Sequence, residues 1–312
     1  MHTIGYLCAA FTVFSWGITF VSTRALLSDF SSLEILFVRF FMAYLVLWLL
    51  APRRLKLESW KEEGYFALAG LTGATIYQML ENMAIEYANA SNVVSIIVSV
   101  SPMFTALVCQ AFLKEKVLSW RFGAGFVIAM LGVAFVCFNG NISFQGDGGM
   151  PINPLGCLLA IAGAACWGFY GLSVGLMNGR NYPQLLALRR MFFYSLVFMI
   201  PFLAYGIIAA PSSGSDFSVN LTAADNIERF SDWKNWLNHL FLGVIASAVS
   251  FATWNYACKI LGTVRVNLGM YISPVVTVVF AFLFLGERLS PMGILGSFLT
   301  IVGVVISDWK KS

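Results

Sequence analysis

The sequence predicts an all-α polytopic membrane protein in which ten transmembrane helices form two inverted five-helix repeats. Three observations support this class. Of 312 residues, 59% are hydrophobic and 11% are charged, whereas about a quarter of the residues in a soluble domain are charged. The apolar residues gather in ten stretches of membrane-spanning length. The two halves of the chain also resemble each other.

The ten stretches are long enough to cross the hydrocarbon core, which takes about 20 residues of helix. In chain order they are 3–23, 33–51, 64–85, 91–113, 122–138, 154–177, 185–209, 237–258, 264–286 and 290–308. We interpret the first as a span and not as a signal peptide, because it lacks a basic leading segment and an evident cleavage site. The loops are too short for a large extramembrane domain, so the functional part must lie within the membrane.

The positions of Lys and Arg predict the orientation, because cytoplasmic loops carry their excess. With the N-terminus inside, twelve fall on the inner side: Arg53, Arg54, Lys56, Lys61, Lys114, Lys116, Arg121, Arg180, Lys259, Arg265, Lys310 and Lys311. Four fall on the outer side: Arg24, Arg229, Lys234 and Arg288. We therefore expect a multi-pass protein of the plasma or inner membrane with both termini in the cytoplasm.

Internal similarity divides the chain into two copies. An offset of 151 pairs Trp16-Gly17 with Trp167-Gly168 and Arg39 with Arg190. An offset of 172 pairs Ser101-Pro102 with Ser273-Pro274 and Glu115-Lys116 with Glu287-Arg288. The expected units are residues 1–140 and 154–312, with a linker at 141–153. Because each unit has five spans, the second enters the membrane upside down, an arrangement typical of transporters with a midplane site. The alternative is a duplication with structural meaning only.

The segments 101–136 and 273–306 each consist of a helix, a short turn with Glu and a basic residue, and a Gly-rich helix. In these segments, and in the Trp-Gly pair of each half, the chain resembles the EamA family of the drug/metabolite transporter superfamily. The usual Gly before the turn glutamate is kept as Gly286 but is Lys114 in the first copy. The resemblance implies ten helices, a central substrate cavity and alternating access. It implies transport of amino acids, aromatic compounds, organic cations or other metabolites, often outward.

Charged residues within the spans are costly in hydrocarbon and need a partner or a purpose. Arg39 and Glu81 are expected at a similar depth, about 9 Å below the outer end of their helices. Three alternatives are open. The two residues form a fixed ion pair, or Glu81 faces the cavity and binds a proton or a substrate ammonium group, or Glu81 reaches the outer interface. The positions that match Glu81 in the second repeat are Thr253 and Trp254, so we expect no carboxylate for Arg190. Either Arg189 or Arg190 then extends to the inner interface, or one faces the cavity.

Aromatic and polar residues of several spans predict the lining of a binding site. Aromatic walls with few polar anchors suit an amphipathic or cationic small molecule. For any single Trp or Tyr, a place at the membrane interface is the alternative. The candidate substrate-binding residues are Trp16, Tyr77, Glu81, Asn82, Ser99, Trp167, Tyr170, Trp254, Asn255 and Tyr271.

Two prolines and a stripe of small residues predict local helix geometry. Pro102 and Pro274 interrupt spans at repeat-related positions, where the freed carbonyl groups favour hinges. In the sixth span two sets of small residues recur at four-residue spacing, Gly171, Gly175 and Gly179 in one and Ala160, Ala164 and Gly168 in the other. This pattern indicates close helix packing. This packing is internal, which we favour, or joins a homodimer.

Together these features predict a membrane transporter of small organic metabolites, an exporter more than an importer, with alternating access and proton coupling through Glu81. No cofactor or metal is expected, since HExxH and P-loop motifs are absent from the sequence. No nucleic-acid partner is expected either, because no basic tract is present; the partners are a small-molecule substrate and the lipid bilayer. The alternatives are an intramembrane lipid-modifying enzyme, which would need clustered His, Asp or Ser, and a channel or receptor.

Overall fold

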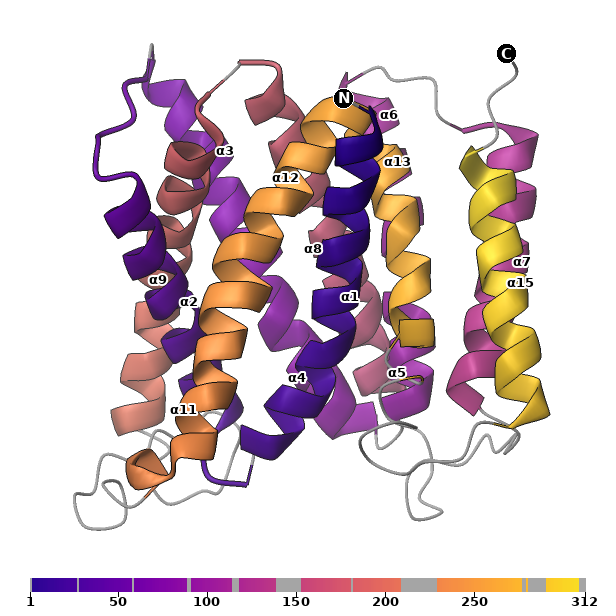
Figure 1. Ribbon diagram of the computed structural model, residues 1–312, viewed down its shortest axis with the longest axis horizontal. Helices are drawn as coiled ribbons and strands as arrows, with labels where there is room; N and C mark the ends of the chain where they lie inside the picture. The colour runs from indigo at the N-terminus through magenta and orange to yellow at the C-terminus, as the bar shows by residue number, and fades with distance from the viewer. Residues whose placement is uncertain are drawn as a thin grey trace.

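The computed structural model of the protein is built almost entirely of helices (Figure 1). It describes residues 2–26, 28–57, 59–88, 91–113, 118–138, 153–180, 182–208, 229–276, 279 and 290–308. No β-strand occurs within these ranges. The turn residues Glu115, Lys116, Glu287 and Arg288 lie outside them, and so does the expected linker apart from Asn153. The unit boundaries at 140 and 154 therefore stay a prediction.

The described residues of the first part of the chain form nine helical elements. They are α1 (His2–Leu26), α2 (Ser32–Leu50), η1 (Trp60–Glu62), α3 (Glu63–Gly70), η2 (Leu71–Ile76), α4 (Tyr77–Ala88), α5 (Ser91–Val98), α6 (Ser101–Leu113) and α7 (Trp120–Phe138). The start of α2 is a capping box, in which the Ser31 amide donates to Glu34 Oε2 at 2.9 Å and the Glu34 amide donates to Ser31 Oγ at 3.3 Å. Both bonds satisfy amides that the first helical turn leaves unpaired.

The second part of the chain supplies eight described elements. They are α8 (Pro154–Asn178), α9 (Gln184–Ile208), α11 (Trp233–Leu240), η4 (Phe241–Val249), α12 (Ser250–Leu261), α13 (Thr263–Leu268), η5 (Gly269–Ile272) and α15 (Pro291–Asp308). Pro154 opens α8, where its missing amide costs nothing. Gly262 ends α12 at φ 91°, a backbone conformation that glycine adopts without strain.

Helix length and composition support a polytopic membrane protein. Five helical segments are long and apolar enough to cross a bilayer: Ser32–Leu50, Ile96–Leu113, Pro154–Asn178, Gln184–Ile208 and Trp233–Leu261. Two shorter apolar helices are Trp120–Val136 and Pro291–Ser307. Large apolar side chains such as Leu49 and Phe298 are exposed on the outer faces, as a hydrocarbon environment allows. The count of ten crossings stays a prediction, because part of the range 264–286 lies outside the described residues.

Two helices change locally from α to π geometry. The π segments are η2 and η4, and adding the sequence offset of 172 to residues 71–76 gives 243–248, which falls inside η4. Gly70 directly precedes η2 and Gly243 lies within η4, and each is close to a neighbouring backbone: a Cβ on Gly70 would lie 2.6 Å from the Met191 carbonyl oxygen, and one on Gly243 would lie 3.3 Å from that of Arg39. The π segments thus fall at positions that the offset of 172 brings together, whereas Gly70 and Gly243 differ by 173 positions. The repeat itself stays a prediction.

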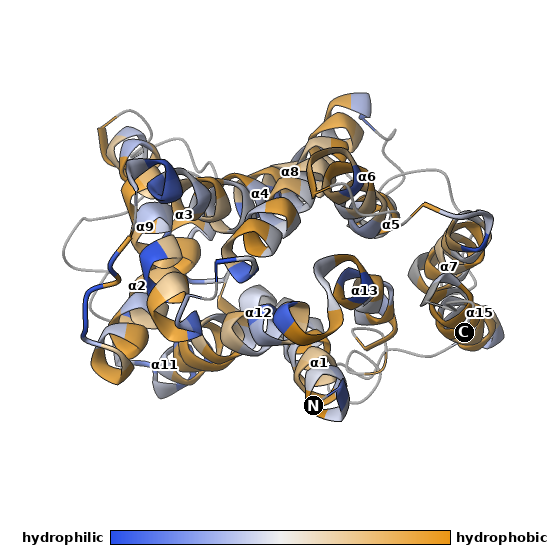
Figure 2. Cartoon of the chain, turned by 90° about the horizontal axis from the view of Figure 1, so that it is seen from above, coloured by the Kyte–Doolittle hydropathy of each residue, from blue (hydrophilic) through white to orange (hydrophobic). Residues whose placement is uncertain are grey.

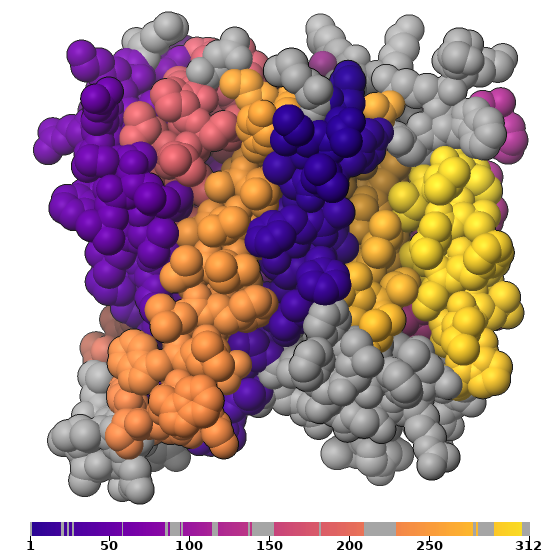
Figure 3. Space-filling view, viewed as in Figure 1, coloured from indigo at the N-terminus to yellow at the C-terminus, as the bar shows by residue number. Residues whose placement is uncertain are grey.

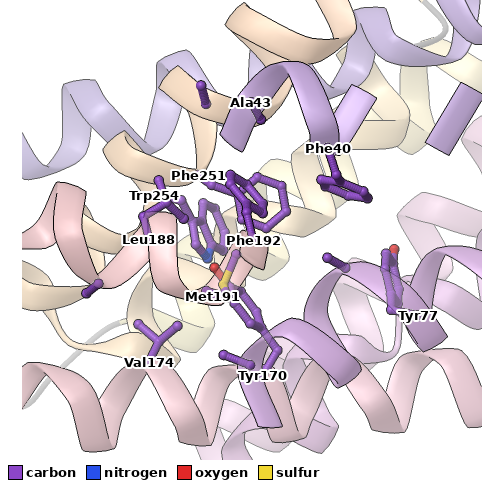
Figure 4. Packing of buried hydrophobic residues seen from close by; sticks show 14 of the residues in the cluster. Phe40, Ala43, Tyr77, Tyr170, Val174, Leu188, Met191, Phe192, Phe251 and Trp254 are labelled. Carbon is purple, nitrogen blue, oxygen red and sulfur yellow. The ribbon is translucent and has the colours of Figure 1, made fainter. Parts of the chain in front are cut away.

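The helices form one central group and a separate pair at one edge. From above, α7 and α15 lie beside each other at one end of the elongated outline (Figure 2). In the central group α1 packs along α12, as the space-filling view shows (Figure 3). Similarly α8 packs against α4 and α6, and α2 packs against α9. The largest core cluster lies where these helices converge, and in it Phe192 of α9 and Phe251 of α12 are 5.4 Å apart (Figure 4).

Candidate functional site

A cluster of aromatic rings fills the centre of the molecule, where four helices meet. The ring centroid of Trp16 on α1 lies 5.6 Å from that of Trp167 on α8 and 5.0 Å from that of Trp254 on α12. Tyr77 of α4 and Tyr170 of α8 pack against Trp167 at 5.0 and 4.9 Å. Each of the five side chains is at most 8% exposed. The structure thus brings together five of the aromatic residues that the sequence singled out.

Hydrogen bonds fix the cluster and connect α8 to the helices opposite. Trp167 Nε1 donates to Asn267 Oδ1 of α13 at 2.7 Å, and the Tyr170 hydroxyl donates to Asn255 Oδ1 of α12 at 2.8 Å. Thr105 Oγ1 of α6 adds a longer bond of 3.4 Å to Asn267 Oδ1. A buried donor left without a partner costs about 1–3 kcal/mol. A rocking of α8 away from α12 and α13 would have to break these bonds or replace them.

A small open crevice, with room for about one water molecule, lies at the end of α8 that we expect to face the cytoplasm. Its lining comes from α8, α9, the turn between them and α12: Val174, Met177, Asn178, Tyr182, Gln184, Ala187 and Asn255. The side chain of Asn255 lines this crevice and also accepts the bond from Tyr170. The crevice and the aromatic cluster therefore meet at Asn255.

The structure does not place Arg39 and Glu81 in an ion pair. Buried Arg39 donates from Nε to Ser247 Oγ at 2.6 Å, and its guanidinium carbon lies 5.5 Å from the Phe40 ring centroid. The partly exposed Glu81 accepts a bond of 3.4 Å from the Tyr77 hydroxyl. Ion pairs between other described residues do form, at Arg180–Glu62, Arg190–Glu63 and Arg229–Glu34. Among the described residues no direct Arg39–Glu81 ion pair is present, although each charge lies within electrostatic reach of the other. A fixed pair and a role of Glu81 in coupling both stay predictions.

The expectation that Arg190 meets no carboxylate is also wrong. Arg190 pairs with Glu63, and its Nε donates to Glu63 Oε2 at 2.8 Å. The Tyr194 hydroxyl donates to the same oxygen at 2.8 Å. Burial raises the pKa of Glu63, but the hydrogen bonds from Arg190 and Tyr194 and the arginine charge outweigh it, so the pKa lies below the usual value. The comparison of the two repeats searched only for a residue that matches Glu81 within the span 64–85. Glu63 lies just before that span, at the start of α3, and was therefore missed.

Arg189 and Arg190 both hold the chain that follows α2. Arg189 donates from Nη1 to the carbonyl oxygen of Ala51 and from Nη2 to that of Arg53 at 2.8 Å. Arg190 Nη1 donates to the carbonyl oxygen of Leu55 at 3.0 Å. These two arginines thus bind the loop at the helix ends, and neither is joined to the aromatic cluster by a described bond. A place of either side chain at the inner interface stays a prediction.

Three candidate residues lie apart from the cluster. Asn82 Nδ2 donates to Ser32 Oγ, which ties α4 to the first turn of α2. Ser99 is buried in the turn between α5 and α6. Tyr271 is fully buried in a second apolar cluster, where its ring centroid lies 6.4 Å from that of Phe126. For these three, a place in the site stays a prediction that the described contacts do not support.

The paired prolines follow breaks in their helices. Pro102 lies in the first turn of α6, after the chain leaves α5 at Val98. Pro274 follows the 3-10 segment η5, in which tighter geometry replaces the α-helix before helical residues resume at Ser273. The interruptions that the sequence predicted are therefore present at both prolines. Their action as hinges stays a prediction.

The small residues of α8 pack against helices of the same chain. A Cβ on Gly171 would lie 2.7 Å from the Thr105 side chain, and one on Gly175 would lie 2.6 Å from Leu113. Both neighbours belong to α6, so this stripe is occupied within the chain. The pattern of small residues is therefore explained by packing within the chain and gives no support for a homodimer, which stays a prediction.

Phe251 lies beside the cluster and was not among the candidates. Phe251 of α12 contacts Trp16 at 5.3 Å and Tyr170 at 6.0 Å, and the Trp16 indole donates from Nε1 to the Ala246 carbonyl oxygen at 2.9 Å. Asn267 is buried between three helices. A polar amide within an apolar span was a usable signal for Asn267, whereas Phe251 is one of 28 phenylalanines and carried none.

Comparison with known proteins decides the family. The sequence pattern of the EamA-like transporter family matches residues 3–138 and 154–307. The chain belongs to this family. As an EamA-like transporter it is a multi-pass membrane protein, and the family indicates transport and not enzymatic catalysis.

Several curated proteins are similar over nearly their whole length. A probable terminal-alkyne amino-acid exporter of Streptantibioticus cattleyicolor is 25% identical over 299 residues, which cover 95% of this chain and 90% of that protein. An uncharacterized transporter of Archaeoglobus fulgidus is 24% identical, with 100% and 99% covered. The uncharacterized inner membrane transporter YedA of Escherichia coli K12 is 24% identical, with 95% and 88% covered.

A solved crystal structure shares the fold of this EamA-like transporter. It superposes with a TM-score of 0.73 and 16% sequence identity, and the match covers 97% of this chain and 96% of the other. At this level of identity the likeness concerns the fold alone. The aromatic cluster, the crevice and the charged residues described above are features of this chain.

Proposed function

We propose that this EamA-like transporter exports small organic metabolites, with amino acids and aromatic or cationic compounds as the substrate class, by alternating access. The observation that carries the proposal is the aromatic cluster at the meeting point of α1, α4, α8 and α12, which borders the crevice through Asn255. Aromatic walls with a few polar anchors are typical of sites for small molecules. The printed name of the Streptantibioticus relative, an amino-acid exporter, favours the same class and direction.

Arg39 and Glu81 give this site both signs of charge. No direct ion pair joins them. Glu81, which among the described contacts accepts only the long bond from the Tyr77 hydroxyl, would bind an ammonium group or a proton, and Arg39, held by the neutral Ser247, would attract a carboxylate. An α-amino acid carries both groups. Charges within the hydrocarbon are costly, so those that occur there are typical of functional sites. We infer that Glu81 couples transport to protons.

Rocking of the repeats is the proposed mechanism. The bonds Trp167–Asn267 and Tyr170–Asn255 join α8 to α13 and α12, so they would break as the site changes sides. The breaks next to Pro102 and Pro274 would serve as hinges. Inverted repeats with units at 1–140 and 154–312 would supply the two equivalent arrangements that this mechanism needs.

Flux in liposomes tests the proposal. The purified protein is reconstituted with amino acids, aromatic compounds and quaternary amines under an imposed pH gradient. We expect saturable flux with counterflow that follows the gradient and is lost in Glu81→Gln. The matched control Asp232→Asn removes the carboxylate of the residue that caps the start of α11, a position where Asn caps as well as Asp. This variant should transport normally. Flux unaffected by Glu81→Gln would remove this residue from coupling, and flux without saturation or counterflow would indicate a channel.

Labelling tests the proposed orientation. Single cysteines replace Lys56, expected inside, and Lys234, expected outside; both side chains are exposed. In intact cells an impermeant maleimide should label the cysteine at position 234 and spare the one at 56. Labelling of both from the same side would contradict the proposed topology, and with it the inverted repeat.

A further inference from the structure

The segment that joins α2 to α3, which includes the start of η1, carries a group of exposed cations. We call residues 51–61 the cationic loop. Arg53, Arg54, Lys56 and Lys61 are exposed, and none of them pairs with a carboxylate among the described residues. Glu58 lies in the loop as well, outside the described residues, so the loop carries a formal charge of 4 − 1 = +3. It lies at the same end of the molecule as the first turn of α1 (Figure 1).

Arg189 and Arg190 hold this loop in a fixed shape. Their bonds to the carbonyl oxygens of Ala51, Arg53 and Leu55 fix its backbone at three points. The Leu55 side chain is buried in the central core cluster. Because the buried leucine and the bound carbonyl groups face the protein, the neighbouring cations face outward. The loop is therefore a preorganised surface and needs little ordering before it binds a ligand.

The carboxylates that follow the loop are already engaged and do not neutralise it. Glu62 is buried and pairs with Arg180, and Glu63 pairs with Arg190. Each glutamate is thus compensated by an arginine of the α8–α9 region. The loop cations keep their full charge, which is available to an anionic partner.

Trp60 places the loop at the membrane surface. It lies within the cationic loop, at the start of η1, and is 90% exposed. A large ring exposed to this degree is unfavourable in bulk water, whereas tryptophan is enriched at the level of the lipid headgroups. Cations within reach of that level meet phosphate groups. Clusters of Lys and Arg next to a transmembrane helix are attracted to anionic lipids.

We propose that the cationic loop binds the headgroups of anionic phospholipids in the leaflet at this end of the protein, the cytoplasmic one in the expected orientation. Arg53, Arg54, Lys56 and Lys61 contact the phosphates, and the Trp60 ring lies among the headgroups. Arg189 and Arg190 are positioning residues that hold the loop and do not touch the lipid. The interaction is independent of the substrate path.

Lipid binding to the purified protein tests this proposal without measuring transport. The protein in neutral detergent is titrated with phosphatidylglycerol or with phosphatidylcholine, and bound lipids are counted by native mass spectrometry. We expect the parent to prefer phosphatidylglycerol. The variant Arg53→Gln/Arg54→Gln/Lys56→Gln should bind phosphatidylglycerol at least about tenfold more weakly than the parent does. The control Lys234→Gln/Lys259→Gln, which removes two exposed cations elsewhere, should bind as the parent does.

Two further measurements keep the test decisive. If the triple variant fails to fold, the single variants Lys56→Gln and Lys61→Gln, at exposed positions whose carbonyl groups carry no arginine bond, should each give a smaller loss of affinity. High salt should weaken binding to the parent more than binding to the triple variant. Equal binding of both lipids, or unchanged phosphatidylglycerol binding in the variants, would overturn the proposal. Displacement of the lipid by inorganic phosphate would show a small-anion site in its place.

Discussion

The contact between α7 and α15 gives a sharp prediction, because backbone meets backbone at its glycines. A Cβ on Gly132 would lie 2.4 Å from the amide nitrogen of Thr300 and 2.6 Å from the carbonyl oxygen of Gly296. Favourable contacts begin at roughly 3.5 Å, so Gly132→Ala requires the two helices to separate by about 1 Å. Neither obstacle is a flexible side chain that could turn away. The substitution must therefore disturb the whole pair.

Two effects of opposite sign decide the magnitude. Overpacking in a tight interface costs about 1–3 kcal/mol, while replacing Gly by Ala in a helix stabilises it by about 0.5–1 kcal/mol. The control Gly123→Ala lies on the same helix, and its Cβ would meet nothing within 4 Å, so it gains helix propensity without the clash. We expect Gly132→Ala to be less stable than Gly123→Ala by about 1–3 kcal/mol, because the difference isolates the clash.

Reversible unfolding in mixed detergent micelles, followed by circular dichroism, measures this difference in the free energy of unfolding. The variant Gly303→Ala should behave like Gly132→Ala, because its Cβ would lie 2.4 Å from the Ala129 amide nitrogen. Equal stability of Gly132→Ala and Gly123→Ala would show that α7 and α15 do not approach this closely, and the reasoning would be refuted.

Three further predictions concern polar contacts. Asn267→Ala leaves the Trp167 indole without an acceptor and should lower the free energy of unfolding by about 1–3 kcal/mol; a double-mutant cycle with Trp167→Phe should return a coupling of about 0.6–1.7 kcal/mol, and a coupling of zero would contradict the bond. Tyr170→Phe keeps the ring but loses the bond to α12, and should cost about 0.6 kcal/mol in the same assay. Since the pKa of Glu63 is lowered on folding, its contribution to stability is full above its unfolded value of about 4.3 and is lost as the pH falls through the folded value. Thermal unfolding between pH 6 and pH 3 should therefore show a smaller loss of stability in Arg190→Gln than in the parent, and parallel curves would argue against the ion pair.

Much of the helical layout could be predicted from local sequence, and the exceptions have a common cause. The ranges 33–51 and 154–177 coincide with α2 and α8 to within about two residues, since a run of apolar side chains is sufficient to define such a helix. The range 64–85 forms a continuous helix as expected, but its middle turns are π-helical. Hydrophobic content does not distinguish α from π geometry. The difference arises where Gly70 and Thr75 approach α9, and Thr75 Oγ1 donates to the Ser195 carbonyl oxygen at 3.0 Å.

The residues of the candidate site could likewise be predicted only in part from the sequence. Trp16, Trp167 and Trp254 could be singled out because large aromatic residues recur in several spans, and the structure brings them together. Tyr271 matched the same description but its ring faces α7, since the rotation of α13 and η5 directs it there. A helix has several faces, and composition alone does not say which of them meets the centre.

By itself the sequence determined the class of protein: apolar stretches of spanning length, few charges and the family pattern follow from composition and order along the chain. Only the tertiary structure decided which charges meet. Arg190 binds Glu63, and Arg39 binds Ser247 without a direct ion pair to Glu81, because pairing depends on the rotation and depth of helices far apart in sequence. Hydrophobicity is a property of each segment, whereas a salt bridge is a property of two surfaces once they are packed.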